Sequence, residues 1–134
     1  MYRATLNRKE IAVGINAGHG TVNGESYYVY SHPDLTPKTT GGSTAAGAVL
    51  TPCDNTGMVF NDGAPESAVT LQMAFVLKDM LLNAGYDVLM VRETENCYMD
   101  VVARTVMCNN LADCHISLHW DGDGLPFEIG RAHV

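Results

Sequence analysis

The chain has 134 residues, of which 46% are hydrophobic, and its 15 acidic against 8 basic side chains give a formal net charge of −7. This length suits one domain, and the hydrophobic content is enough for a core, which argues against global disorder. No apolar run approaches the roughly 18 residues of a membrane helix, and we expect no secretory signal peptide in residues 1–10, which lack an apolar stretch. The acidic balance argues against nucleic acid as the main partner, because binding phosphate needs a basic surface.

The four cysteines, Cys53, Cys97, Cys108 and Cys114, form no C-x2-C pair, so the spacing of a zinc ribbon is absent. A chain of this size can build a core without disulfide bonds. We therefore expect mostly free thiols.

The first half of the chain holds one clear strand and one clear helix. Apolar and β-branched residues at 11–15 predict a strand that ends in a glycine-rich turn. Residues 21–65 then show no sustained period and are rich in glycine and proline, which predicts a long loop. After Pro65, apolar residues recur at spacings of three and four until Gly85 ends the helix. The predicted buried stripe of this helix comprises Val69, Met73, Val76, Leu77, Met80, Leu81 and Ala84.

The second half continues the alternation of strands and helices. Residues 86–91 predict a buried strand, residues 100–111 a helix, and residues 114–119 a third strand whose side chains alternate between two faces. The order strand, helix, strand, helix, strand predicts an α/β fold. We expect three layers, in which a largely parallel twisted sheet is flanked by helices.

Three residues of metal-binding types converge on one edge of this predicted sheet. His19 lies just past the first strand, His119 is the last residue of the third strand, and Glu66 is in the first turn of the first helix. Parallel sheets place their sites at the carboxyl ends of the strands, and the first turn of a crossover helix sits over that same edge. Two imidazoles and one carboxylate are a ligand set of catalytic zinc, with the fourth position open to water. Taken singly, each residue also has a structural interpretation, as a hydrogen-bonded histidine or as a glutamate that complements the helix dipole.

Four motifs in order resemble the zinc-dependent N-acetylmuramoyl-L-alanine amidases of type 3. The sequence Ile-Asn-Ala-Gly-His-Gly at residues 15–20 is similar to the strand and Pro-Gly-His-Gly motif with which that family begins. Residues 66–94 look like its glutamate helix and the following G-Y-x-V strand, and residues 104–119 resemble its block of Arg, Asn, Ala-Asp and Ser-Ile-His. The resemblance covers residues 11–20 and 65–121.

This resemblance implies that His19, Glu66 and His119 bind Zn²⁺. It also implies hydrolysis of the amide that joins N-acetylmuramic acid to L-alanine, with peptidoglycan as the partner. The cell wall is the expected place of action, and synthesis in the cytoplasm, as for a phage lysin or a sporulation enzyme, stays open. We expect a monomer that binds neither nucleic acid nor membrane.

The family's general acid/base is a glutamate on a strand well downstream of the last histidine, and the chain has no matching segment. We therefore expect this glutamate beyond the end of the chain and little or no turnover from the 134 residues alone. Glu93, Glu95 and Glu128 are the remaining late glutamates, and none stands in that context. Arg104, on the second helix, is a candidate ligand for a substrate carboxylate, with a structural ion pair as the alternative.

The last seven residues, Glu-Ile-Gly-Arg-Ala-His-Val at 128–134, match the in-frame translation of a sequencing adapter. We expect a partial amidase domain over residues 1–127, with a long loop insertion at 21–65 and an incomplete carboxyl-terminal part, followed by a non-native tail at 128–134.

Two other functions compete with the enzyme. One is a wall-binding or zinc-binding module of the same fold that does not hydrolyse its ligand. The other is a nucleotide-binding domain that uses residues 14–20 as a phosphate loop. This second alternative is weak, because the chain has no G-x-G-x-x-G and no helix follows the turn directly.

Overall fold

A computed structural model of the chain describes residues 1–39 and 46–120. Its central element is a parallel sheet of three strands in the order β4-β1-β5. The strands are β1 (Ala12–Ala17), β4 (Asp87–Met90) and β5 (Cys114–Leu118). Because β1 is central and all three strands run the same way, the turn that follows β1 lies between the carboxyl ends of its two neighbours.

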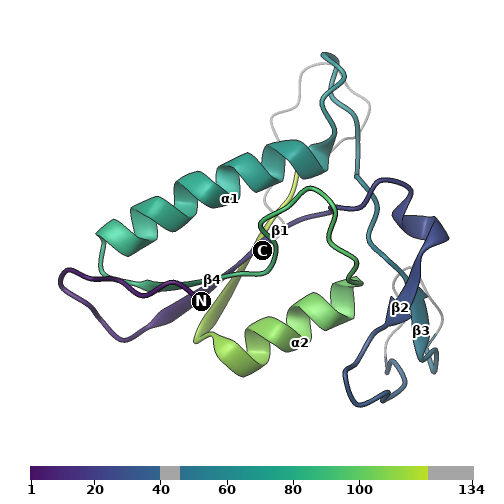
Figure 1. Ribbon diagram of the computed structural model, residues 1–134, viewed down its shortest axis with the longest axis horizontal. Helices are drawn as coiled ribbons and strands as arrows, with labels where there is room; N and C mark the ends of the chain where they lie inside the picture. The colour runs from purple at the N-terminus through teal and green to yellow at the C-terminus, as the bar shows by residue number, and fades with distance from the viewer. Residues whose placement is uncertain (40–45, 121–134) are drawn as a thin grey trace.

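Two helices cover the two faces of this sheet (Figure 1). Helix α1 (Glu66–Asn83) packs against β1 and β4, and α2 (Val101–Leu111) packs against β5 and β1. The predicted α/β fold class, with a parallel sheet between two layers of helix, is confirmed. Helix α1 starts directly after Pro65 and is followed by Gly85 in the left-handed conformation, with φ 90°.

Alternate residues of the strands enter two separate cores. On the α1 face the buried cluster comprises Ile15, Ala17, Leu71, Ala74, Val88 and Met90. On the α2 face it comprises Leu89, Val91 and Cys108. A Cβ atom at Gly14 would lie 2.9 Å from Cys108 Sγ, so the missing side chain lets α2 approach the sheet closely.

The buried face of α1 differs from the predicted stripe. Three residues of that stripe are largely exposed, namely Met73 (41%), Val76 (61%) and Met80 (64%). The buried residues of the helix are Glu66, Ser67, Thr70, Leu71 and Ala74. Leu77 and Leu81 of the predicted stripe do pack against the core. Spacing alone placed the rest of the stripe wrongly, because the face toward the sheet includes two hydroxyls, which are buried with partners. The hydroxyl of Thr70 donates to the carbonyl of Gly18 at 2.8 Å, and that of Ser67 donates to the carboxylate of Glu95.

The described part of the region from residue 21 to 65 contains more regular structure than the predicted loop. It contains a 3₁₀ turn at Gly24–Ser26 and a two-stranded antiparallel sheet of β2 (Tyr28–Tyr30) and β3 (Leu50–Pro52), which lies beside the start of α2 (Figure 1). Strands of three residues are too short to show a period in the sequence.

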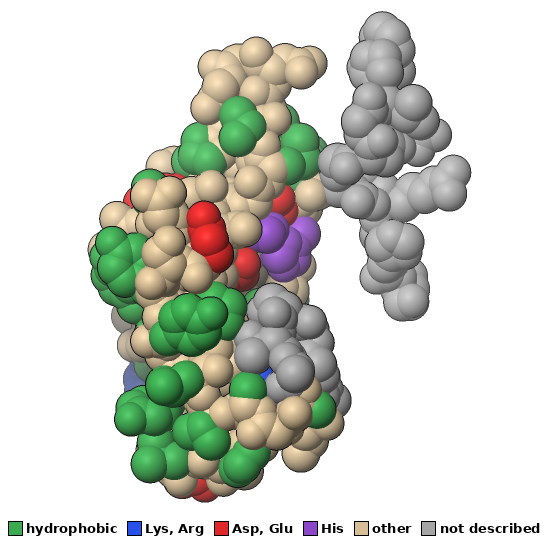
Figure 2. Space-filling model, turned by 90° about the vertical axis from the view of Figure 1, so that its right-hand side faces the viewer, with side chains coloured by type: hydrophobic (Ala, Val, Ile, Leu, Met, Phe, Trp, Pro, Cys, Tyr) green, Lys and Arg blue, Asp and Glu red, His purple; other side chains and the backbone are tan. Residues whose placement is uncertain are grey.

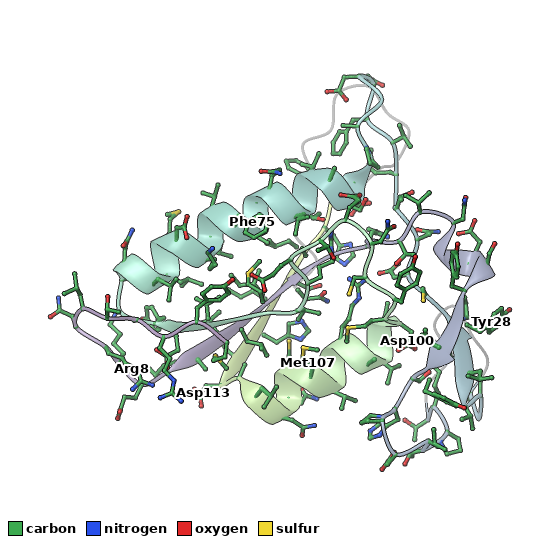
Figure 3. All side chains as sticks on the ribbon, in the orientation of Figure 1. Arg8, Tyr28, Phe75, Asp100, Met107 and Asp113 are labelled. Atoms are coloured by element: carbon green, nitrogen blue, oxygen red, sulfur yellow. The ribbon has the colours of Figure 1, made fainter. Side chains whose placement is uncertain are left out.

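Asp100 joins this small sheet to α2 (Figure 3). Its Oδ1 accepts a hydrogen bond from the backbone N–H of Ala103 at 2.8 Å and so caps the helix. Its Oδ2 accepts from the hydroxyls of Ser31 at 3.0 Å and Thr51 at 2.8 Å, and Lys38 Nζ lies 3.5 Å away. Because Asp100 is only 1% exposed, the region is tied to the domain by a buried polar cluster.

The predicted tail at 128–134, with Glu128, lies outside the described residues. Neither helix within residues 1–39 and 46–120 is long and apolar enough to cross a membrane. All four cysteines are free thiols in the structure.

Candidate metal centre

His19 is placed by the turn that follows β1. Its backbone is in the left-handed region, with φ 62°, a conformation that costs energy for a residue with a side chain. Two buried arginines hold the carbonyls of this turn. Arg104 Nη1 donates to the carbonyls of Ala17 at 3.1 Å and His19 at 2.8 Å, and Arg92 donates to those of Ala17 at 2.9 Å and Gly18 at 3.1 Å. These hydrogen bonds fix the turn and therefore the direction of the imidazole.

Glu66 is the first residue of α1 and is only 3% exposed. Its Oε2 accepts from the backbone N–H of Met58 at 3.2 Å, and its Oε1 accepts from that of Trp120 at 2.9 Å. A carboxylate at this position also interacts favourably with the positive end of the helix dipole. Both oxygens are thus held in place from two different parts of the chain.

His119 follows directly after β5. The backbone N–H of Gly18 donates to the carbonyl of Leu118 at 2.9 Å, so the pairing of β1 with β5 continues up to this histidine. The rings of His19 and His119 pack edge to face, with centroids 4.9 Å apart and an interplanar angle of 88°. The side chain of His119 is 49% exposed, which leaves this side of the cluster open to solvent.

The three side chains lie close enough together to form a candidate site for one metal ion. Glu66 Oε2 lies 3.2 Å from His19 Nε2, and Glu66 Oε1 lies 3.2 Å from His119 Nδ1. One ligand atom from each residue lies within 4.8 Å of the others. Nitrogen and oxygen ligands bind zinc at about 2.0–2.2 Å, which separates neighbouring ligands of a tetrahedron by about 3.3 Å. On the face of the molecule in Figure 2, histidine side chains stand beside acidic ones.

A fourth side chain, Asp54, adjoins this cluster. Asp54 Oδ1 lies 3.2 Å from His19 Nδ1. This carboxylate raises the pKa of His19, although burial of the ring acts in the opposite direction. Burial, the largest single effect, would raise the pKa of Asp54, but the hydrogen bond and charge of His19 together with the charges of Arg104 and His119 lower this pKa below the ordinary value. Asp54 is therefore held as a negatively charged carboxylate beside the imidazole of His19.

The family model described as N-acetylmuramoyl-L-alanine amidase matches residues 13–126, which include His19, Glu66 and His119. The chain belongs to this family. No curated protein matches it at a significant level.

Two solved structures share the fold of this amidase-family chain. One is the N-acetylmuramyl-L-alanine amidase Ami1 from Mycobacterium smegmatis, with a TM-score of 0.63 and 22% identity over 94% of the chain and 51% of that structure. The other is the apo form of Ami1 from Mycobacterium abscessus, with a TM-score of 0.62 and 22% identity over 84% of the chain and 49% of that structure. The chain thus spans about half the length of the solved structures it matches.

Arg104 lies beneath the site of this amidase-family chain instead of facing its open side. The side chain is completely buried, and its hydrogen bonds go to the carbonyls of Ala17 and His19 and the side-chain oxygen of Asn16. These contacts place the guanidinium against the turn that carries His19.

The late glutamates have other partners than the metal cluster. Glu93 accepts a hydrogen bond from the hydroxyl of Tyr2, and Glu95 accepts one from the hydroxyl of Ser67.

Two residues beside the cluster, Asp54 and Gly57, were not predicted from the sequence, and both come from the region predicted to be a loop. A Cβ atom at Gly57 would lie 2.5 Å from Glu66 Oε2 and 2.6 Å from His19 Cδ2, so this segment passes directly over the cluster. The one available signal was indirect, because a long segment without periodicity inside a compact domain is often functional.

Proposed function

We propose that this chain carries the zinc centre of a peptidoglycan amidase that hydrolyses the amide between N-acetylmuramic acid and L-alanine with a zinc-activated water. The observation that carries the proposal is the donor set of His19, Glu66 and His119 at one open edge of the sheet. Membership of the amidase family supports the choice of substrate. The proposed place of action is the cell wall.

The three candidate ligands would contribute to metal binding in different ways. The buried carboxylate of Glu66 supplies a negative charge in a fixed orientation, set by the backbone N–H groups of Met58 and Trp120. The imidazoles of His19 and His119 would hold the metal beside this carboxylate, and the half-exposed His119 lies on the side of the cluster that is open to solvent. A zinc ion held by these residues would supply Lewis acidity to the scissile carbonyl and lower the pKa of a water towards about 7.

Amide hydrolysis also requires a group that takes a proton from the water and gives one to the leaving amine. Glu93 and Glu95 are engaged with Tyr2 and Ser67. On the resemblance to the amidase family we assign this general acid/base role to a further glutamate, other than Glu93, Glu95 and Glu128.

Zinc content tests the metal centre. The purified chain should contain one zinc per molecule, as measured by inductively coupled plasma mass spectrometry. The variants His19→Ala, Glu66→Ala and His119→Ala should lose the zinc. His115→Ala is the matched control. His115 lies on β5, the strand that ends just before His119, and it is exposed and not part of the cluster. A wild-type chain that takes up no zinc would disprove the proposal.

Release of amino groups tests the reaction. New amino-terminal L-alanine should appear when the longest gene product that contains this chain acts on purified peptidoglycan, and it should disappear in the Glu66→Ala variant. Zinc binding without release from walls of several chemotypes would instead indicate a non-catalytic wall-binding or zinc-binding module.

A further inference from the structure

Asp54 contacts His19 at the ring nitrogen that does not face Glu66. Its Oδ1 lies 3.2 Å from His19 Nδ1, whereas the other ring nitrogen, Nε2, lies 3.2 Å from Glu66 Oε2. The two nitrogens of one imidazole therefore face two different carboxylates. Since only Nε2 faces the ligand cluster, Asp54 contacts the ring behind the metal position and is not a fourth ligand.

Both partners of this contact are shielded from solvent. The side chain of His19 is 22% exposed and that of Asp54 is 15% exposed. The Nδ1 atom itself is buried and has no well-aligned hydrogen-bond partner in the structure, so its one approach to an acceptor is the 3.2 Å contact with Asp54. A buried nitrogen that carries a proton needs an acceptor, since a lost hydrogen bond is costly where water cannot replace it. The carboxylate of Asp54 is the acceptor within reach.

Backbone hydrogen bonds hold Asp54 in this place from three sides. The N–H of Cys53 donates to the carbonyl of Tyr27 at 2.8 Å, and the N–H of Asp54 donates to that of Met99 at 3.2 Å. The N–H of Gly20, next to His19, donates to the carbonyl of Asn55 at 2.8 Å. The segment is thus attached to the small sheet, to the residues before α2 and to the turn that carries the histidine.

From this geometry we propose that Asp54 is a positioning residue for the metal centre. Its carboxylate accepts the Nδ1 proton of His19, which fixes the tautomer and ring orientation that present the Nε2 lone pair to the metal. A histidine that binds a metal almost always donates its other N–H in this way, and loss of the acceptor costs about 10-fold to 100-fold in metal affinity. The inference rests on the proposed metal centre, and Asp54 acts on it only through His19.

The tautomer of His19 is the first test, and it needs neither metal nor a variant of Asp54. Because Glu66 also faces Nε2 at 3.2 Å, the test uses the metal-free Glu66→Ala chain, in which only Asp54 competes for the proton. Nitrogen NMR at a pH where the imidazoles are neutral should show the proton of His19 on Nδ1, and the resonances are assigned by their loss when His19→Gln is added. A proton on Nε2 in the Glu66→Ala chain would overturn the inference, whatever the metal measurements give.

Zinc affinity is the second test. Competition with a chromophoric chelator should show about 10-fold to 100-fold weaker zinc binding in Asp54→Asn, together with a shift of the His19 proton away from pure Nδ1. Asp79→Asn is the matched control, because it removes the same charge from an exposed aspartate on α1, and it should bind zinc like the wild type. The thermal unfolding midpoint of the metal-free Asp54→Asn chain should stay near that of the wild type.

The outcomes separate the two proposals. A wild-type chain that binds no zinc contradicts the proposed function, whereas the tautomer of the metal-free chain still decides the role of Asp54. Equal zinc affinity in Asp54→Asn and the wild type contradicts the positioning role alone. If Asp54→Asn loses its fold, the tautomer in the Glu66→Ala chain decides the matter.

Discussion

The guanidinium of Arg104 donates a hydrogen bond to the backbone carbonyl of His19 at 2.8 Å from a position that is completely buried. The arginine belongs to α2, and the histidine belongs to the turn after β1. This bond connects the packing of the helix against the sheet to the direction of the imidazole. Two roles for Arg104 can be distinguished by substitution. Loss of a residue that supports the turn should lower stability, whereas loss of a residue that binds substrate should raise KM.

Replacement of Arg104 by methionine should destabilise the fold by about 3 kcal/mol, because hydrogen bonds from a charged donor contribute about 1.5–3 kcal/mol each and the freed carbonyls stay buried. Urea unfolding of the metal-free chain measures this loss. Zinc binding should weaken in the same variant, although Arg104 is not a ligand. An unchanged stability with a raised KM for peptidoglycan would instead indicate a substrate ligand.

Replacement of Gly57 by alanine should weaken zinc binding by about 10-fold or more, an estimate based on the cost of disturbing the surroundings of metal ligands. The new Cβ would lie 2.5 Å from Glu66 Oε2, so the carboxylate has to move. Gly63→Ala is the matched control, since Gly63 also has a positive φ, of 87° against 72° for Gly57, but its Cβ would meet nothing within 4 Å. Both variants should lose about 1–3 kcal/mol of stability from backbone strain. Equal zinc affinities in the two variants would show that Gly57 is not constrained by the site.

The convergence of His19, Glu66 and His119 was predictable from the sequence because each residue stands at the end of a regular element. Once the strands are parallel, topology alone brings these ends to one edge of the sheet. No detail of side-chain packing is needed for that inference.

Asp54 and Gly57 were not predictable by the same reasoning. They reach the site through individual hydrogen bonds, such as the one from Gly20 to Asn55, and these bonds leave no periodic pattern in the sequence. The prediction of the buried face of α1 was partly wrong for a related reason. The hydroxyl of Thr70 can be buried because it donates a hydrogen bond to the carbonyl of Gly18, and that partner is 52 residues away in the chain.

Removal of zinc should lower the stability of the wild-type chain and leave the ligand variants unchanged. Binding to the folded state alone stabilises it by about 2.7 kcal/mol when free zinc is 100 times its dissociation constant. The thermal unfolding midpoint should therefore fall when a chelator is added to the zinc-loaded wild type. In Glu66→Ala the same chelator should change nothing, and His115→Ala should behave like the wild type. A wild-type midpoint that does not respond to zinc or chelator would contradict a metal centre.

The contact between Arg8 and Asp87 should make the stability of the fold depend on acid. Arg8 Nε donates to Asp87 Oδ1 at 2.9 Å, and the backbone N–H of Ala4 donates to the same oxygen at 3.0 Å. The hydrogen bonds from Arg8 are the main cause that lowers the pKa of Asp87 to about 2, and burial opposes them. An aspartate in an unfolded chain has a pKa of about 4, so protons bind the unfolded state more readily.

The stability that Asp87 contributes should accordingly be complete above about pH 4 and should disappear as the pH falls through about 2. Urea unfolding of the metal-free wild type and of Asp87→Asn, at several values between pH 5 and pH 2, measures the difference between the two free energies of unfolding. This difference should shrink towards the acid end, because protonation removes from the wild type what the variant has already lost. Asp79→Asn controls for the change in net charge and should keep a constant, small difference. A difference between wild type and Asp87→Asn that stays constant over this range would contradict the lowered pKa.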